Sequence, residues 1–220
     1  MVGIAGQAVA AILTRAPSAG GKSRLFTALG READRALLSA LLLDTFDAVA
    51  ASGLPVVICF TPESARDELV ALMPSAALFI PQRDGDLGER MRGTFDDVLR
   101  AGARGVVLVG SDLPLIDPTS IKEAADRVDR VPDSVVLGPT PDGGYYLIAA
   151  TRTPTHLFEN VRWGTPRVLD ETRRLAQRHH VELAYVTEGS DIDTPEDLRA
   201  LIHADSSRAP RTRQWVRTNC

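Results

Sequence analysis

Short apolar runs alternate along the chain with longer segments whose apolar residues recur at helical spacing. The short runs end at Gly, Pro or polar residues, which is typical of buried strands, whereas the longer segments are typical of helices packed on a sheet. This pattern predicts strands at 8–13, 55–60, 76–80, 105–110, 134–137, 145–150 and 181–186. It predicts helices at 32–51, 63–73, 89–101, 118–130, 165–178 and 195–202.

The alternation of strands and helices predicts an α/β fold, a three-layer α/β/α sandwich with a mostly parallel sheet. The strands at 134–137 and 145–150 are too close in sequence for a helical crossover, so they are not expected to be parallel neighbours and the sheet is expected to be mixed. A chain of 220 residues fits one domain, which we place at 1–204. Residues 205–220 are polar, rich in Arg and aperiodic, which predicts a disordered tail.

Composition narrows the partners that the chain is expected to bind. Hydrophobic residues make up 44% and charged residues 25%, which is ordinary for a soluble globular protein. The net charge of −4 gives no general attraction to nucleic acid or to an anionic membrane, and no apolar stretch reaches the ~20 residues of a membrane helix. Cys59 lies in an apolar run, and residues 1–13 lack the basic start of a signal peptide. We therefore expect a cytoplasmic protein that binds small molecules.

Asp112 directly follows the apolar run 105–110, in the sequence Ser111-Asp112-Leu113-Pro114. In an open α/β sheet, ligands bind beyond the carboxyl ends of the strands, which is where this carboxylate is expected. A carboxylate is a hard oxygen donor that suits Mg²⁺ or Mn²⁺ carrying a nucleotide diphosphate. The alternative is structural, with Asp112 accepting hydrogen bonds from backbone N–H groups ahead of the helix near Pro118.

The loop after the first predicted strand combines glycine with basic side chains; its candidate residues are Arg15, Gly20, Gly21, Lys22 and Arg24. Adjacent glycines let backbone N–H groups approach phosphate oxygens closely, and Lys and Arg add positive charge. The spacing is neither that of a Walker loop nor that of a dinucleotide fingerprint. We favour phosphate binding over the alternative of a solvated glycine-rich surface loop.

Local structure explains most of the segment 82–91. Asp84-Gly85 is typical of a turn, and Asp86 with Glu89 has the spacing of a capping box at a helix start. Arg90 follows in the first turn, where its guanidinium could face a substrate phosphate or carboxylate. We keep Arg90 as a candidate substrate-binding residue.

Two prolines and three glycines surround one carboxylate at 138–147, in the order Gly-Pro-Thr-Pro-Asp-Gly-Gly-Tyr-Tyr-Leu. A tight hairpin turn at Asp142-Gly143 is one explanation. It gives no reason for the flanking Gly-Pro and the second glycine, so we favour a rigid loop that a ligand approaches closely. We predict that Asp142, Gly143, Gly144 and Tyr145 bind substrate, with Asp142 accepting hydrogen bonds from sugar hydroxyls or positioning an acceptor.

The segment 190–198 starts a helix and carries extra carboxylates just before it. Thr194 as N-cap, Pro195 at the first helical position and acidic residues in the first turn predict the helix start. That signal does not explain Asp191 and Asp193, which can point together into a cleft as metal ligands. We select Asp193 as the second metal ligand beside Asp112, on the expectation that the fold brings them together.

With these stretches in place, the chain resembles the bacterial radical-SAM/selenodomain-associated transferase 1 family, also described as arsenosugar-biosynthesis glycosyltransferases. The resemblance covers about residues 8–202. Its motifs are Pro17-x-x-Gly20-x-Lys22-x-Arg24-Leu25, 85–91, Gly110-Ser111-Asp112-x-Pro114, 138–147 and Asp191-x-Asp193-Thr194. The resemblance implies a nucleotide-diphospho-sugar transferase (glycosyltransferase-A-like) fold with a divalent metal at Asp112.

Other similarities keep a second reaction open. The segment 193–198 is similar to the closing motif of sugar-activating cytidylyltransferases, whose matching Asp binds Mg²⁺. The segment 21–25 is similar to phospholactate and phosphoenolpyruvate guanylyltransferases of deazaflavin-cofactor synthesis. The segment 13–17 departs from the Leu-Ala-Ala-Gly-Gly-rich loop with which nucleotidyltransferases of this fold usually begin.

The sequence thus favours a metal-dependent glycosyltransferase that uses a nucleotide-diphospho-sugar and a small acceptor. The metal, Mg²⁺ or Mn²⁺ on Asp112 and Asp193, would neutralise the leaving diphosphate. The residues assigned to the nucleotide and its phosphates are Arg15, Gly20, Gly21, Lys22, Arg24 and Ser111. The alternative is a nucleotidyltransferase that joins an NTP to a small phosphorylated acid and releases pyrophosphate. A non-catalytic nucleotide sensor is a third hypothesis, which the acidic pair disfavours because a sensor needs no metal ligands.

Overall fold

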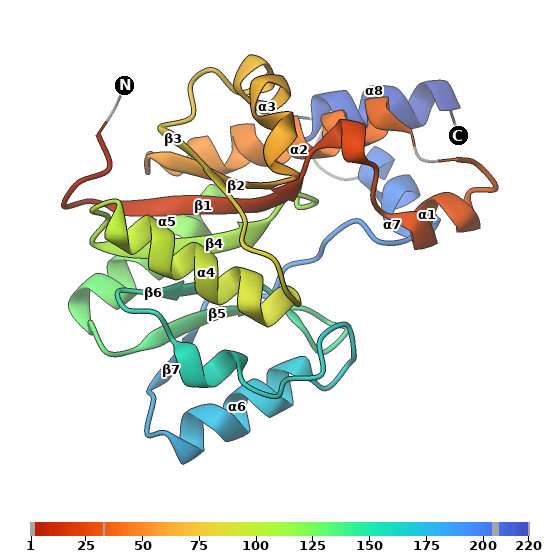
Figure 1. The fold of residues 1–220 in the computed structure, drawn as a ribbon. Helices are drawn as coiled ribbons and strands as arrows, with labels where there is room; N and C mark the ends of the chain where they lie inside the picture. The colour runs from red at the N-terminus through yellow and green to blue at the C-terminus, as the bar shows by residue number, and fades with distance from the viewer. Residues whose placement is uncertain (1–2, 33, 204–206, 220) are drawn as a thin grey trace.

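The structure is a computed structural model and describes residues 3–32, 34–203 and 207–219. Within these residues, the strands form one sheet in the order β3-β2-β1-β4-β6-β5-β7 (Figure 1). Their bounds are β1 Ala8–Arg15, β2 Val56–Thr61, β3 Leu78–Pro81, β4 Gly105–Gly110, β5 Val135–Pro139, β6 Tyr145–Ala150 and β7 Leu183–Tyr185. β6 is antiparallel to both β4 and β5, whereas the other neighbours are parallel. The predicted mixed, mostly parallel sheet is confirmed.

Helices pack on both faces of this sheet. Their bounds are α1 Ser23–Ala28, α2 Arg35–Ala50, α3 Arg66–Leu72, α4 Leu87–Arg100, α5 Pro118–Arg130, α6 Val168–Arg178, α7 Pro195–Ala200 and α8 Pro210–Asn219. α2, α3 and α5 pack on one face through Phe46, Leu69 and Ile121. α4 and α6 pack on the other face through Phe95 and Leu169. This is the three-layer arrangement expected from the sequence.

The coverage of both faces explains why the strands read as continuous apolar runs. In β1, Ala10 and Ile12 point into one helical layer and Val9 and Ala11 into the other, and all four side chains are fully buried. Successive residues of a strand point to opposite faces, so a strand covered on both sides has few polar positions. In β1 the polar residues, Thr14 and Arg15, come at the carboxyl end of the strand.

Several helix bounds differ from the expectation by a few residues, and two differences near the N-terminus have a clear physical reason. The helix expected at 32–51 begins at Arg35, because the Asp34 carboxylate accepts hydrogen bonds from the N–H groups of Ala36 (2.8 Å) and Leu37 (3.3 Å). The sequence did not predict α1, which is six residues long and too short to be stable in isolation. Its buried Leu25 and Phe26 pack against distant parts of the chain.

The expectation of a disordered tail at 205–220 is corrected by the structure, which shows a helix in this stretch. Of this stretch, residues 205, 206 and 220 lie outside the described residues, and α8 occupies Pro210–Asn219. The buried carboxylate of Asp44 accepts hydrogen bonds from the Thr212 N–H (2.7 Å) and hydroxyl (2.8 Å). Trp215 and Val216 are buried as well. Composition suggested disorder because the partners that stabilise this helix lie far away in sequence.

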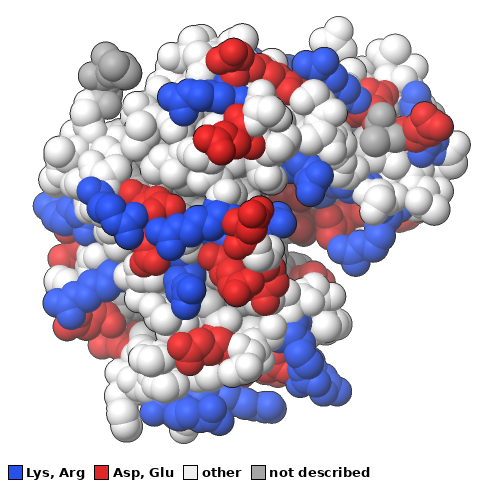
Figure 2. All heavy atoms as spheres, in the orientation of Figure 1, with Lys and Arg blue, Asp and Glu red and all other residues white. Residues whose placement is uncertain are grey.

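The charge on the surface and the length of the helices bear on whether the chain binds nucleic acid or a membrane. On the face shown in Figure 2, acidic and basic side chains are intermixed instead of forming one basic area. Within the described part of the chain, no helix has the length and apolar character needed to cross a bilayer. The expectation that the chain binds no nucleic acid stays a prediction.

Candidate active site

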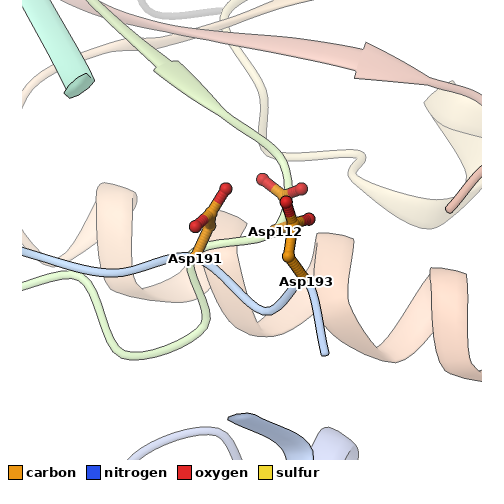
Figure 3. A group of neighbouring side chains, drawn as sticks. All are labelled: Asp112, Asp191 and Asp193. Atoms are coloured by element: carbon orange, nitrogen blue, oxygen red, sulfur yellow. The ribbon is translucent and has the colours of Figure 1, made fainter. Parts of the chain in front are cut away.

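Three carboxylates meet beyond the carboxyl end of β4. Asp112 lies in the loop after β4, whereas Asp191 and Asp193 lie in the segment that leads into α7 (Figure 3). The backbone N–H of Ile192 donates to the carbonyl of Asp112 at 3.0 Å and joins the two segments. One carboxylate oxygen of each Asp lies within 4.8 Å of the others. The structure therefore brings together Asp112 and Asp193, as expected, and adds Asp191.

The chemistry of these donors fits a divalent cation. Mg²⁺ and Mn²⁺ prefer carboxylate oxygens, and ligands on one ion at about 2.1–2.4 Å can lie no more than about 4.8 Å apart. The spacing of the three Asp oxygens meets that limit. Asp112, Asp191 and Asp193 could therefore share one ion.

Lys22 already supplies positive charge to this cluster. Its Nζ lies 2.6 Å from Oδ2 of Asp112 and 2.8 Å from Oδ1 of Asp193. Its side chain is only 12% exposed. Lys22 adopts a left-handed backbone conformation (φ 48°) as the N-cap of α1, which turns the chain toward the carboxylates. The phosphate-binding residue expected from the sequence is thus an ion-pair partner of the acidic cluster.

The electrostatics of the cluster shift two pKa values. Burial acts to lower the pKa of Lys22, but the charges of Asp112 and Asp193 and their hydrogen bonds outweigh it, so that the pKa is raised and Lys22 stays protonated. Burial, followed by the nearby charges of Asp112 and Asp193, raises the pKa of Asp191 to about 6. A cation bound here would relieve the repulsion among the carboxylates.

A cleft of about 640 Å³ opens beside the cluster. Its lining includes Ser111, the three carboxylates and Arg24, whose side chain is 86% exposed and whose Nη2 lies 3.9 Å from Oδ2 of Asp193. It also includes Asp142, Gly144, Tyr145 and Trp163. Ligand sites of this size accommodate a nucleotide-sized molecule.

The loop between β5 and β6 serves as both a hairpin turn and part of the cleft wall. The Asp142 carboxylate accepts hydrogen bonds from the Thr140 hydroxyl and from the Gly144 N–H (3.2 Å), as in a self-stabilised turn. Gly143 has φ 87°, and a Cβ added there would overlap the carbonyl oxygen of Pro166. A tight hairpin turn and a rigid loop at a ligand site, the two interpretations of this sequence, are therefore compatible.

Aromatic side chains continue the wall next to this loop. The rings of Tyr145 and Trp163 meet edge to face, with centroids 6.4 Å apart. Burial raises the pKa of the Tyr145 hydroxyl, so it stays protonated at neutral pH. Trp163 also packs against Gly88 at the start of α4. The pair forms a rigid aromatic surface.

Several expected residues do not line the cleft. The Arg90 guanidinium donates to the Gly85 carbonyl at 2.9 Å, next to the capping box of Asp86 and Glu89. Arg15 donates to the Ala19 carbonyl at 3.4 Å. The described lining contains neither of these arginines, nor Gly20, Gly21 and Gly143. Their roles in binding stay predictions.

The sequence alone assigns no role to Gln82, a polar residue whose side chain lies near the carboxyl ends of two strands. Gln82 donates from its side-chain amide to the carbonyls of Thr14 (2.7 Å) and Cys59 (2.8 Å), so it joins β1 and β2 near their carboxyl ends. The available signal was a polar residue directly after a strand. The Asp-x-Asp pattern in the sequence contains Asp191, although only Asp193 is predicted from it as a metal ligand.

The fold and the site define a transferase, an enzyme of the nucleotide-diphospho-sugar transferase fold. A solved structure from Desulfovibrio desulfuricans G20, described as that of a nucleotide-diphospho-sugar transferase, is 26% identical, with a TM-score of 0.81 over 96% of this chain and 97% of that chain. The chain belongs to the family described as "Uncharacterized protein conserved in bacteria" (DUF2064), whose model matches residues 43–165.

Two curated proteins are also similar. The 2-phospho-L-lactate guanylyltransferase of Methanothrix thermoacetophila is 29% identical over 200 residues, 87% of this chain and 83% of that protein. The 3-phospho-D-glycerate guanylyltransferase of Phenylobacterium zucineum is 30% identical over 200 residues, 85% of this chain and 86% of that protein. These similarities favour the nucleotidyltransferase alternative over glycosyl transfer.

Proposed function

We propose that the protein is a metal-dependent nucleotidyltransferase that joins an NTP, with GTP the first choice, to a small phosphorylated acid. The observation that carries the proposal is the cluster of Asp112, Asp191 and Asp193 beside a nucleotide-sized cleft. The choice of donor and acceptor rests on the two guanylyltransferases to which the chain is similar. Their names specify phosphorylated acids as acceptors.

In this reaction an oxygen of the acceptor's phosphate attacks the α-phosphorus of the NTP. The bond from the α-phosphorus to the oxygen bridging to the β-phosphate breaks, and pyrophosphate leaves with the bonding electrons. Mg²⁺ or Mn²⁺ held by Asp112, Asp191 and Asp193 would supply Lewis-acid stabilisation of the charge on the phosphates.

The basic side chains give this chain its own means of holding phosphates. Arg24 lines the cleft and is largely exposed, so its guanidinium can form paired hydrogen bonds with phosphate oxygens. Lys22 keeps one positive charge at the carboxylates and limits their repulsion of an incoming triphosphate. Catalysis would then rest on positioning and electrostatic stabilisation.

The part of the cleft lined by the β5–β6 loop offers a place for the acceptor. Asp142, Gly144 and Tyr145 line the cleft on a loop whose conformation is fixed by its own hydrogen bonds. A fixed wall of this kind can hold a small molecule in line with the α-phosphorus. We assign Asp142 to positioning of the acceptor.

Glycosyl transfer is the second candidate, because the Desulfovibrio desulfuricans G20 protein is described as a nucleotide-diphospho-sugar transferase. Asp142 would then accept hydrogen bonds from sugar hydroxyls. The radical-SAM/selenodomain-associated name and a cytoplasmic location stay predictions.

The test measures two products with Mg²⁺ or Mn²⁺ present. The protein is incubated with each NTP and a panel of phosphorylated acids that includes 2-phospho-L-lactate and 3-phospho-D-glycerate. Pyrophosphate release together with a nucleotidyl-acid product in the mass spectrum is the expected result. Release of a nucleoside diphosphate from nucleotide sugars, without pyrophosphate from any NTP, would instead favour glycosyl transfer. Metal-independent nucleotide binding without turnover would favour a sensor.

A further inference from the structure

Beyond the two cores that cover the sheet, a third apolar cluster lies at the end of the molecule where α1, α7 and α8 gather (Figure 1). We name it the α8 cluster. Its buried members are Leu25, Phe26, Leu37, Leu41, Ile192, Leu198, Leu201, Ala209, Trp215 and Val216. They come from segments that are far apart in sequence and meet only in the folded protein.

The members of the α8 cluster are close in sequence to the charged residues of the active site. Leu25 lies in α1, three positions after Lys22. Ile192 lies between Asp191 and Asp193, and its N–H donates to the Asp112 carbonyl. The same cluster therefore supports the segment with the ammonium and the segment with two carboxylates.

Trp215 connects α8 to the start of α2. The residue is 7% exposed, and its Nε1 donates to Oδ2 of Asp34 at 3.0 Å. The other oxygen of Asp34 caps α2 at Ala36 (2.8 Å). The Arg31 guanidinium lies over the indole, 5.1 Å from the ring centroid. One carboxylate and one aromatic ring thus fix α8 against the chain that follows α1.

A second attachment fixes the first turn of α8. The Asp44 side chain has no exposed surface, and besides its bonds with Thr212 it accepts a hydrogen bond from Nη1 of Arg211 at 3.0 Å. Such donors replace the hydrogen bonds to water that a buried carboxylate loses. The position of α8 is therefore set at two points, in its first turn and at Trp215 in its middle.

From this arrangement we propose that α8 is a positioning element of the active site and that Trp215 is its main positioning residue. The apolar contacts around Trp215 hold α1 and the 191–193 segment together, and they thereby hold Lys22 on Asp112 and Asp193. Loss of the indole leaves both sheet cores intact but lets the two charged segments separate. The proposal rests on the proposed function and refines it, yet its main test needs no activity.

The chain provides its own reporter, because Lys22 and Lys122 are its only lysines. Lys122 is 63% exposed and pairs with Asp126 in its own helix, at 3.3 Å, whereas Lys22 is 12% exposed between two carboxylates. Labelling with an amine-reactive reagent, followed by peptide mass spectrometry, gives the rate at Lys22 relative to that at Lys122. In the wild type we expect Lys22 to react at least about tenfold more slowly, because labelling requires local opening.

Trp215→Ala should raise the relative labelling rate of Lys22 about tenfold. Trp215→Phe should give an intermediate rate, because it keeps an aromatic ring but cannot donate a hydrogen bond to Asp34. Leu157→Ala is the matched control, since Leu157 is fully buried in the core on the α4 face and away from the α8 cluster. It should destabilise the protein while leaving the labelling ratio unchanged. Circular dichroism and a cooperative thermal transition establish that each variant is folded.

A second measurement follows Mn²⁺ binding by electron paramagnetic resonance without nucleotide. Trp215→Ala should weaken binding about tenfold, in the range that supporting residues contribute to metal sites.

An unchanged labelling ratio in folded Trp215→Ala would overturn the positioning role, and so would an equal increase in Leu157→Ala. If Trp215→Ala does not fold, Val216→Ala, which truncates a fully buried neighbour, takes its place. A wild type that binds no Mn²⁺ would count against the proposed metal site, while the labelling ratio would still decide the role of α8.

Discussion

The two walls of the cleft are built in different ways. The charged wall contains Asp193, whose carboxylate is paired at 2.8 Å with Lys22, 171 positions away in sequence. At the wall formed by the β5–β6 hairpin loop, the Asp142 carboxylate accepts hydrogen bonds from Thr140 and Gly144, all within five residues of chain. The charged wall therefore depends on packing across the whole fold, whereas the hairpin wall is organised locally. Substitutions should distinguish the two walls. The charged wall should respond to changes in distant parts of the chain, whereas the hairpin wall should respond to changes within its own loop.

The largest effect is expected from Asp112→Asn, which removes the charge at the centre of the charged wall but keeps the shape of the side chain. Turnover should fall about 1,000-fold, because metal stabilisation of phosphate charge contributes several kcal/mol. Steady-state pyrophosphate release measures the loss. Asp84→Asn, which changes an exposed carboxylate outside the cleft, is the control and should leave turnover unchanged. Full activity in Asp112→Asn would remove this residue from its proposed role.

The hairpin wall is tested by Gly143→Ala. Its φ of 87° and the overlap of an added Cβ with the Pro166 oxygen together force the backbone to move. We expect the free energy of unfolding in urea to fall by about 2–3 kcal/mol. Gly164→Ala has a similar φ of 73° with no described atom within 4 Å, so it should lose only about 1 kcal/mol. Equal losses in the two variants would show that close contact at Gly143 is unimportant.

The repulsion within the charged wall is tested by Asp191→Asn without metal. The folded carboxyl has a pKa raised to about 6, so it binds its proton more tightly than in the unfolded chain, and the contribution of Asp191 to stability falls as pH rises from about 4 to 6. At pH 7 the Asn variant should be more stable by about 1–2 kcal/mol, a value reduced for partial solvent screening, and the gain should vanish near pH 4. Urea unfolding at both pH values measures it. Mn²⁺ should reverse the order, because the wild type binds it more tightly.

The smallest effect is expected from Arg90→Ala. The guanidinium donates to Gly85 within its own loop and does not line the cleft. Both KM and kcat should stay within about twofold of the wild type, since an exposed contact of this kind contributes little. Arg24→Ala serves as the comparison and should raise KM for the nucleotide about tenfold, as expected when a charge-assisted phosphate contact is lost. A larger effect at Arg90 than at Arg24 would place the phosphates elsewhere.

The same contrast between local and distant contacts explains what could be predicted from the sequence. The helix at Pro118–Arg130 and the strand at Tyr145–Ala150 match their predicted bounds, because periodicity and nearby Pro or Gly residues mark them. The turn at Asp142 and the capping box at Asp86 were also readable, since each is completed within a few residues.

What the sequence could not reveal depends on partners far along the chain. The helix α8 is polar and rich in Arg, and its stability comes from Asp44, 168 positions away from Thr212. The ion pairs of Lys22 with Asp112 and Asp193 likewise need the finished fold. The sequence indicated candidate basic and acidic residues, but it could not show that Lys22 of the basic loop forms ion pairs with Asp112 and Asp193.

The ammonium of Lys22 has a consequence for ion selectivity. A sodium or potassium ion that entered between Asp112 and Asp193 would bring no more charge than the lysine already provides. A doubly charged ion brings twice as much, so it neutralises the three carboxylates better than a monovalent ion does. We therefore expect the three-carboxylate site, with Lys22 in place, to bind divalent cations in preference to monovalent ones.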